Sequence, residues 1–95
     1  MNLRHLRCLI AVAEELHFGR AARRLHIEQS PLSRTIRQME ANLGVSLLDR
    51  SPRRVRLTPA GQVFLEDARR VLVAFEQAQT KARAAANHRN TLRIA

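Results

Sequence analysis

The stretch FGRAARRLHIEQSPLSRTIRQMEANL, residues 18–43, decides the fold of this chain. In its second half, four apolar residues stand at spacings of four, three and four, which aligns them on one face of an α-helix. They are Leu32, Ile36, Met39 and Leu43. We expect that face to lie in the core. The opposite side carries the polar residues Ser30, Ser33, Arg34, Arg37 and Gln38.

Those polar residues are of types that reach both the phosphates and the base edges of DNA. A shorter helix is predicted before them, because small and apolar residues recur on one side of residues 18–25, and residues 26–28 form the turn. Pro31 falls in the first turn of the second helix, where its missing amide hydrogen costs nothing, and Gly44 is a suitable C-terminal stop. The pattern predicts a helix-turn-helix over about residues 18–43, with its second helix suited to a DNA major groove.

The composition is strongly basic. Seventeen Lys and Arg against eight Asp and Glu give the 95 residues a formal charge of +9. Most of these cations are arginine, whose planar group suits phosphate and guanine, although a basic excess also serves general solubility.

The aromatic residues are three Phe, with no Tyr or Trp, which argues against binding single-stranded nucleic acid by stacking on its bases. The lone Cys8 is expected in the core. A length of 95 residues allows one domain at most. Because there is no long apolar run and no signal-peptide pattern, we expect it in the cytoplasm.

Further patterns flank the central stretch. Over residues 3 to about 16, the apolar residues predict a first amphipathic helix with a broad buried face. Within residues 45–57, apolar and polar residues alternate, which predicts two short strands joined around Pro52. Such a hairpin would be a wing. Its tip carries Arg53 and Arg54, which suit phosphates or a minor groove.

A long helix is predicted from Thr58 and Pro59, a cap and first-turn pair, to about residues 87–90. Apolar residues repeat in it at alternating spacings of four and three, which makes a heptad seam. The members of the seam are Phe64, Ala68, Val71, Phe75, Ala78, Ala82 and Ala85. We interpret the seam as a dimer interface with its beginning docked on the head, and leave open a helix folded back on its own domain. Residues 91–95 alternate like the start of a strand, so we expect a longer protein.

Three segments together closely resemble the N-terminal part of LysR-type transcriptional regulators, in that family's order and spacing. They are LRHLRCLIAVAEELHFGRAARRLHI (3–27), QSPLSRTIRQMEANLGVSLLDR (29–50) and RRVRLTPAG (53–61). The resemblance implies a mainly α fold, with a winged helix-turn-helix at 1–58, a linker helix at 59–88 that forms an antiparallel dimer, and the start of a truncated effector-binding domain at 89–95. It also implies sequence-specific binding of interrupted palindromes in double-stranded promoter DNA, with activation or repression in response to a small metabolite.

The resemblance also assigns roles to residues. It places Gln29, Ser33 and Arg34 at the front of the recognition helix and Arg53 at the minor groove. For base contact we name Gln29, Ser30, Pro31, Ser33 and Arg34. For the backbone or the minor groove we name Arg20, Arg37, Gln38, Arg50, Arg53 and Arg54. Phosphate contact alone stays open for Gln29 and Arg34, helix capping for Ser30, and an intramolecular pair with an acidic residue for Arg50.

Three residues depart from what is usual in the family. Glu28 stands where Ser or Thr is common, Ser30 where Pro is usual, and Cys8 where an aromatic is favoured. A carboxylate at position 28 would repel phosphate, but it can favour a helix N-terminus. Because two of the departures lie where the recognition helix begins, we expect the docking mode to follow the family more closely than the operator sequence does.

We expect no catalytic residue, metal or cofactor in this chain, and a small-molecule effector only for the C-terminal part of a longer protein. The four histidines lack compact metal-ligand spacing, and no motif places a base beside a nucleophile. The expected partners are double-stranded promoter DNA, a second copy through the linker helix, a tetramer at full length, and RNA polymerase as a further candidate. A membrane is not expected, because the seam is rich in alanine. A protein-interaction module is the remaining alternative, which a cationic helix face paired with an arginine-tipped wing disfavours.

Overall fold

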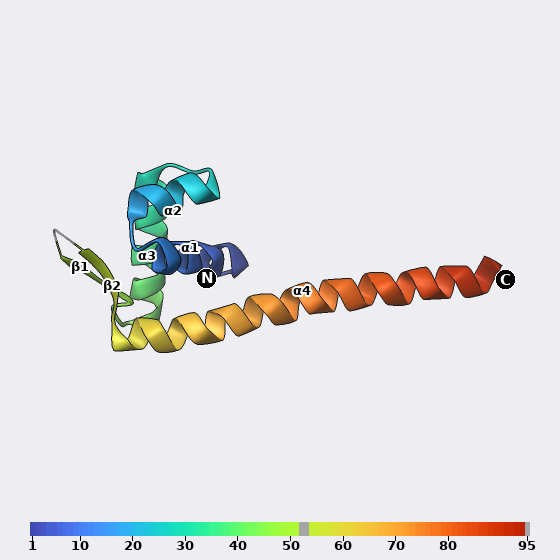
Figure 1. Cartoon of the computed structure of the whole chain (residues 1–95). Coiled ribbons are helices and arrows are strands. Elements are labelled where there is room, and N and C mark those ends of the chain that lie inside the picture. The colour runs from blue at the N-terminus through green and yellow to red at the C-terminus, as the bar shows by residue number, and fades with distance from the viewer. Residues whose placement is uncertain (52–53, 95) are drawn as a thin grey trace.

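The computed structural model describes the backbone of residues 1–51 and 54–94, and the side chains of residues 1–50 and 54–87. Its elements are, in order, α1 (Leu3–Glu15), α2 (Phe18–Leu25), α3 (Gln29–Leu43), β1 (Leu48–Ser51), β2 (Arg54–Leu57) and α4 (Pro59–Ile94). Everything before α4 forms a head at one end of that helix, and the molecule is 64 Å long (Figure 1). The predicted order of three helices, a hairpin wing and one long helix is confirmed.

Side chains cap the first two helices. At the start of α1, the Asn2 side chain accepts a hydrogen bond from the His5 N–H (3.1 Å), and the His5 ring accepts one from the Asn2 N–H (3.2 Å). At the start of α2, Nδ1 of His17 accepts a hydrogen bond from the backbone N–H of the third residue of the helix (3.0 Å). Both helices end on a left-handed residue, Leu16 with φ 52° and His26 with φ 58°. These ends turn the chain sharply, so the three helices of the head pack on one another.

The core of the head lies between these helices and the base of the wing. Its largest fully buried side chains are Leu9, Val12, Leu32, Ile36, Met39 and Leu47. Ala21 and Ala22 of α2 are buried too, and their small size lets the neighbouring helices approach closely. Cys8 is buried as expected, and burial raises the pKa of its thiol. The placement of Leu43 in the core is wrong: it is 37% exposed, because it lies in the last turn before Gly44 ends α3 and the chain leaves the core.

The wing is a two-stranded antiparallel sheet, with Leu48 paired to Leu57 at its base. Both residues pack with the core of the head. The next residue, Thr58, starts α4: its hydroxyl accepts a hydrogen bond from the Gly61 N–H (2.9 Å) and donates one to the Ser46 carbonyl (2.6 Å). The predicted cap is therefore confirmed, and it also ties α4 to the loop before β1.

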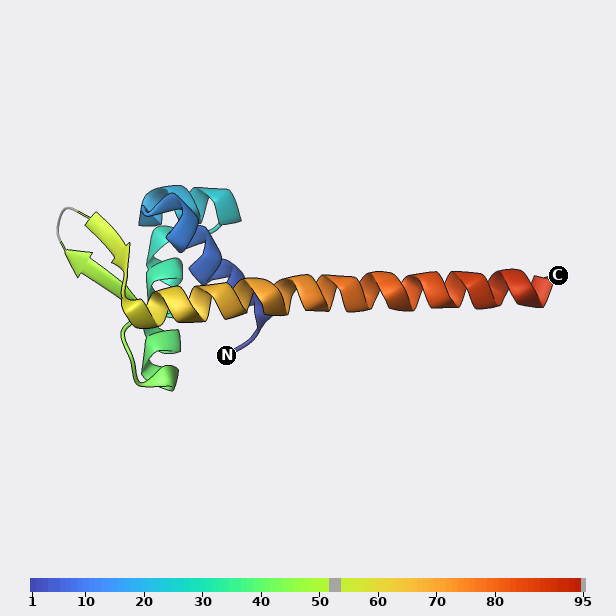
Figure 2. The ribbon, with the colours of Figure 1, turned by 60° about the horizontal axis from the view of Figure 1, so that its bottom comes forward.

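α4 packs on the head only over its first turns. Its buried stripe consists of Gly61, Leu65, Ala68 and Leu72. Figure 2 shows α1 lying against the first part of α4, whose remainder projects away from the head. The predicted seam adjoins this stripe on the helix and shares Ala68 with it. Ala68 is covered by its own head, which corrects its placement in the dimer interface, and Phe64 is half-buried against the same core.

α4 is longer than expected. It runs without a break from Pro59 to Ile94, whereas the sequence predicted an end at about residues 87–90. The prediction of a strand at residues 91–95 is wrong for 91–94, whose backbone is helical. A short alternation does not stop a helix that is already nucleated, because extending it fixes only one residue for each added hydrogen bond.

Gly61 is where α4 lies closest to the loop before β1. A Cβ at this position would overlap the carbonyl oxygen of Leu47, which also accepts a hydrogen bond from the Thr58 N–H (3.0 Å). Because the obstacle is backbone, no side-chain rotation relieves it. We expect Gly61→Ala to lower the free energy of unfolding, measured by urea denaturation, by about 1–3 kcal/mol. Ala60→Ser, at the exposed neighbouring position, should change it by less than about 0.5 kcal/mol; equal effects would contradict the close approach as the cause.

Candidate nucleic-acid interface

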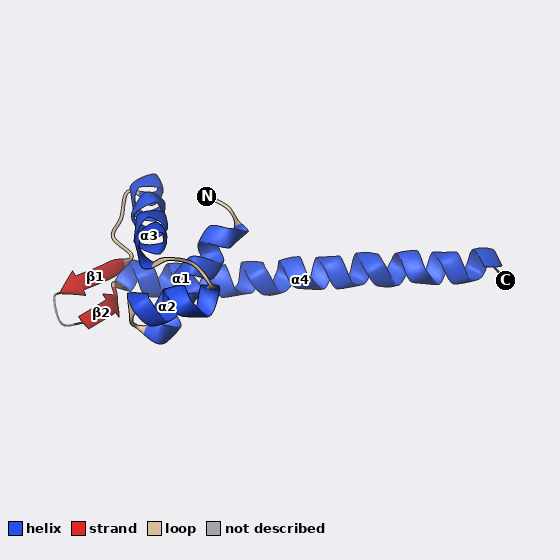
Figure 3. Cartoon of the chain, turned by 90° about the horizontal axis from the view of Figure 1, so that it is seen from above, coloured by secondary structure: helices blue, strands red, loops and turns tan. Residues whose placement is uncertain are grey.

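A short turn sets the angle between α2 and α3. The N–H of His26 donates a hydrogen bond to the Arg23 carbonyl (3.1 Å), and the N–H of Ile27 donates one to the Ala22 carbonyl (3.0 Å). The Ile27 side chain packs against the core beneath the turn. The turn thereby holds α3 with its apolar face inward. Figure 3 shows that α3 and the wing share one end of the molecule, away from the C-terminal part of α4.

The outer side of α3 is exposed and cationic. Ser30, Arg34, Arg37 and Gln38 are all exposed. Where side chains are described, neither of these two arginines has a hydrogen-bond or ion-pair partner. Other arginines do pair with acidic residues: Arg20, Arg24, Arg50, Arg69 and Arg70. Glu40, the one acidic residue of α3, is bonded to the loop before the wing, so the outer side keeps its positive charge.

The front of α3 is open. The helix begins at Gln29, and Glu28 occupies the cap position without making a side-chain capping bond. Ser30 is therefore the second residue of the helix, and the capping alternative does not apply to it. Gln29 is exposed, and its Oε1 lies beside the glycine of α2. Pro31 and Ser33 are half-buried, so each presents only part of its side chain at the surface.

The described cations of the wing differ from those named from the sequence. The guanidinium of Arg50 bonds Glu40 (3.1 Å), which is the intramolecular alternative left open for it. Arg54 is exposed on β2 and also interacts within the chain. Arg53, the other predicted tip residue, lies outside the described residues. Arg56 is exposed on the same strand, and the two-residue alternation of β2 would have placed it on the face of Arg54.

A cluster of ion pairs joins α1, α2 and α4. Glu14 of α1 pairs with Arg24 of α2 (2.6 Å) and with Arg69 of α4 (2.9 Å). Its neighbour Glu15 also pairs with Arg24 (3.3 Å), and its carbonyl accepts a hydrogen bond from Arg20 (3.1 Å). The bond from Arg24, aided by Arg69, holds the pKa of Glu14 below its usual range although burial opposes this. No local pattern in the sequence connects residues so far apart, so this cluster was not predicted.

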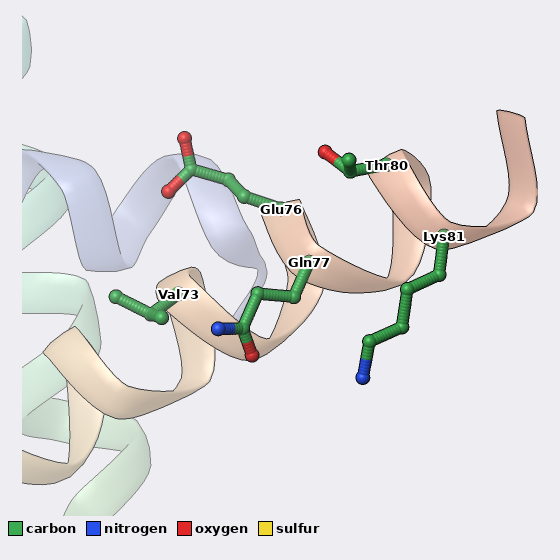
Figure 4. A pocket seen from close by; sticks show the side chains of 5 residues that line it. All are labelled: Val73, Glu76, Gln77, Thr80 and Lys81. Carbon is green, nitrogen blue, oxygen red and sulfur yellow. The ribbon is translucent and has the colours of Figure 1, made fainter. Parts of the chain in front are cut away.

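Other kinds of site find little support. Among the described residues, no three His, Cys, Asp or Glu side chains are grouped to hold a metal ion. The described helices include no stretch with the length and apolarity of a membrane span. One hollow on α4 is lined by Val73, Glu76, Gln77, Thr80 and Lys81, which Figure 4 shows along the helix. All five belong to α4, so the hollow has no opposite wall to enclose a ligand.

The sequence matches known regulators. The family model described as "Bacterial regulatory helix-turn-helix protein, lysR family" matches residues 3–62. The HTH-type transcriptional regulator AlsR of Bacillus subtilis (strain 168) is 56% identical over 77 residues, which cover 81% of this chain and 26% of that protein. ClcR of Pseudomonas putida is 54% identical over 85 residues, 90% of this chain and 29% of that protein. The chain thus spans less than a third of these relatives' length.

Solved structures of protein–DNA complexes are similar as well. The CbnR DNA-binding domain in its DNA complex has a TM-score of 0.88 and 49% identity, covering 90% of this chain and 99% of that one. The BenM DNA-binding domain with benA site 1 DNA has a TM-score of 0.88 and 43% identity, covering 90% and 97%. The head, wing and α4 therefore have the winged helix-turn-helix arrangement of these domains.

The pH dependence of stability tests the Glu14 cluster. Because the folded chain holds the pKa of Glu14 below its usual range, this carboxylate stabilises the fold above its unfolded pKa, and that contribution is lost as pH falls through the folded pKa. We expect the free energy of unfolding of the wild type, measured with urea between about pH 6 and about pH 3, to fall more steeply than that of Glu14→Gln, with the curves converging in acid. Arg69→Gln should reproduce part of this change, whereas Arg83→Gln, exposed beyond the head, should not. Parallel curves for Glu14→Gln and the wild type would contradict the cluster's role.

Proposed function

The chain belongs to the LysR family of bacterial regulatory helix-turn-helix proteins, and we propose that it binds double-stranded promoter DNA in a sequence-specific way. α3 enters the major groove, and the wing lies at the minor groove or the backbone. The observation that carries the proposal is the outer side of α3, where Arg34 and Arg37 are exposed without a partner among the described residues. Arginine donors not engaged within the fold remain available to guanine and phosphate. The likeness to the CbnR and BenM DNA complexes supports the same docking.

The residues at the front of α3 read the bases. Gln29 and Arg34 contact base edges, because Gln pairs with adenine and Arg with guanine in bidentate geometry. Ser30 donates to a base or a phosphate from the exposed side of the first turn. Ser33 and Pro31 contribute through the parts of their side chains that reach the surface.

The remaining contacts go to the backbone and the minor groove. The residues proposed for them are Arg20, Arg37, Gln38, Arg53 and Arg54. Arg50 is left out because Glu40 holds its guanidinium and its side chain is only 26% exposed, whereas Arg20, which pairs with Glu15, is 61% exposed. If each head neutralises about five phosphates, a dimer makes about ten such contacts, and the logarithm of its affinity falls with the logarithm of salt concentration with a slope of roughly −9.

A second copy joins along α4. Beyond the head, α4 exposes Val71 (47%) and Phe75 (40%), followed on the same side by Ala78 and Ala82. A continuous row of exposed apolar side chains favours burial against a partner helix. In an antiparallel pair the two heads lie at opposite ends, where they meet the two half-sites of an interrupted palindrome.

Further partners concern a longer protein. The chain covers 26% of AlsR and 29% of ClcR, and we propose that the remainder of such a protein binds a small-molecule effector. At full length we propose a cytoplasmic tetramer, with RNA polymerase as a further partner. To this chain we assign no catalytic, metal-binding or cofactor-binding residue.

Selection from random duplex DNA tests the function. The chain is incubated with the pool at two salt concentrations, and the bound fraction is sequenced. We expect an enriched interrupted palindrome with half-sites separated by about one helical turn or a multiple of it, and the steep salt slope given above. Salt-sensitive binding without an enriched sequence would contradict sequence reading and leave only general attraction to DNA.

Arg34→Ala tests base reading by α3. We expect it to relax the preference at one base pair of each half-site, with a loss of about 1–3 kcal/mol of discrimination, measured by fluorescence anisotropy on single-base variants of the enriched duplex. Arg37→Ala is the matched control: it should weaken binding to enriched and scrambled duplexes alike and reduce the salt slope by about 1 per head. Equal losses on both duplexes for Arg34→Ala would remove its assignment to a base.

Phe75→Asp tests the dimer. A carboxylate in the centre of the exposed row would have to be buried without a partner, so we expect monomers in sedimentation equilibrium at concentrations where the wild type is a dimer. Val73→Asp places the same charge on the opposite side of α4, where Val73 is 51% exposed, and should leave the dimer intact. Dissociation by both substitutions, or by Val73→Asp alone, would place the interface elsewhere.

A further inference from the structure

Glu40 connects several segments of the head. Its Oε2 accepts hydrogen bonds from the N–H groups of Leu47 (2.7 Å) and Leu48 (3.2 Å) and from the hydroxyl of Ser46 (3.2 Å). Its Oε1 accepts a hydrogen bond from Nη2 of Arg50 (3.1 Å). One carboxylate on α3 thus binds the loop that follows the helix, the start of β1 and a side chain within β1.

Arg50 extends this cluster to α2. Its guanidinium carbon lies 5.5 Å from the ring centroid of Phe18, the first residue of α2. The side chains of Arg50 and Glu40 are only 26% and 16% exposed, so solvent screens their charges incompletely. Nε of Arg50 is buried and has no hydrogen-bond partner among the described residues. Glu40 and Phe18 are therefore the groups that hold this guanidinium in place.

The wing needs such a support. Each of its strands has four residues, and an isolated two-stranded hairpin is at best marginally stable in water. The buried side chains of Leu47 and Leu48 anchor its base, but hydrophobic burial is not directional and does not fix the tilt of a strand. The charge-assisted hydrogen bonds that this carboxylate accepts from two successive amides and from Arg50 are directional, and they orient β1 relative to the axis of α3.

We propose that Glu40 is a positioning residue for DNA binding: it sets the tilt of the wing relative to α3, so that both meet one duplex at the same time. The inference rests on the proposed DNA binding. Glu40 acts through the wing and not by touching DNA. In Figure 1 the wing lies at the end of the head opposite to the part of α4 that projects away. An antiparallel dimer joined along α4 would therefore carry its wings at the two outer ends, beyond the base pairs that α3 reads.

The experiment compares Glu40→Gln with the wild type on two duplexes. The substitution keeps the size of the side chain and one acceptor oxygen, and removes the charge that holds Arg50. One duplex carries the enriched palindrome with about one extra helical turn at each end, and the other stops at the outermost enriched base pairs. We expect the affinity for the long duplex to fall about 5- to 30-fold, with a salt slope lowered by about 1 per head, while the affinity for the short duplex changes less than about 2-fold.

Two controls separate positioning from charge and from folding. Glu28→Gln removes the same charge from the other end of α3, where Glu28 makes no capping bond, and should change the binding of both duplexes by one common factor. Amide hydrogen exchange reports the Glu40 bonds without DNA: the N–H groups of Leu47 and Leu48 should exchange faster in Glu40→Gln, while the core amide of Ile36 should not. Should Glu40→Gln not fold, Arg50→Gln removes the same ion pair from the side of the wing and takes its place.

The outcomes are distinct. An equal loss on both duplexes, no loss on either, or unchanged exchange at Leu47 and Leu48 overturns the positioning role while leaving DNA binding in place. A wild-type chain that enriches no sequence overturns the proposed function, and this inference with it. Selective loss on the long duplex, with the α3 sequence preference retained, supports the inference.

Discussion

The burial of one face of α3 is the constraint on which the rest of the structure depends. Leu32, Ile36 and Met39 are fully excluded from solvent, and they hold in place a 15-residue helix whose other side has no partner within the described head. A helix of this length is marginal by itself in water, so its order comes from packing. α1, α2 and the base of the wing supply that packing. The rest of the head thus holds the outer side of α3 in a fixed position at the surface.

The ion pairs also differ between the packed parts of the head and the exposed outer side of α3. Where elements distant in the sequence meet, arginines are matched by carboxylates: Glu14 joins α4 to α2, and Glu40 joins the wing to α3. On the outer side of α3, Arg34 and Arg37 have no carboxylate partner among the residues whose side chains are described. Because an exposed ion pair contributes little to stability, leaving Arg34 and Arg37 unpaired costs the fold little, and their field reaches about 10 Å into the solvent at moderate ionic strength.

Local periodicity explains how much could be predicted from the sequence. In the helices, the wing and the start of α4, apolar residues recur every two, three or four residues. Such a spacing can be recognised within one short segment of sequence, so these elements could be predicted. The Glu14–Arg69 pair, 55 residues apart, has no local signal, and neither has the choice of Glu40 as the acidic partner of Arg50. Ala68 belongs to two overlapping apolar stripes, and only the packed head decides which of them buries it. The base and backbone contacts stay predictions, and Arg53 lies outside the described residues.

Most of α4 projects beyond the head, so a small change in the curvature of this helix displaces its far end. From Leu72, the last residue of the buried stripe, to Ile94, the helix extends about 33 Å at about 1.5 Å per residue. Long helices curve gently, and a smooth bend of about 10° over this length would move the far end by about 3 Å, nearly one base-pair step. The separation between two heads joined along α4 is then a mechanical property of one helix, which slight curvature can adjust without altering any groove contact.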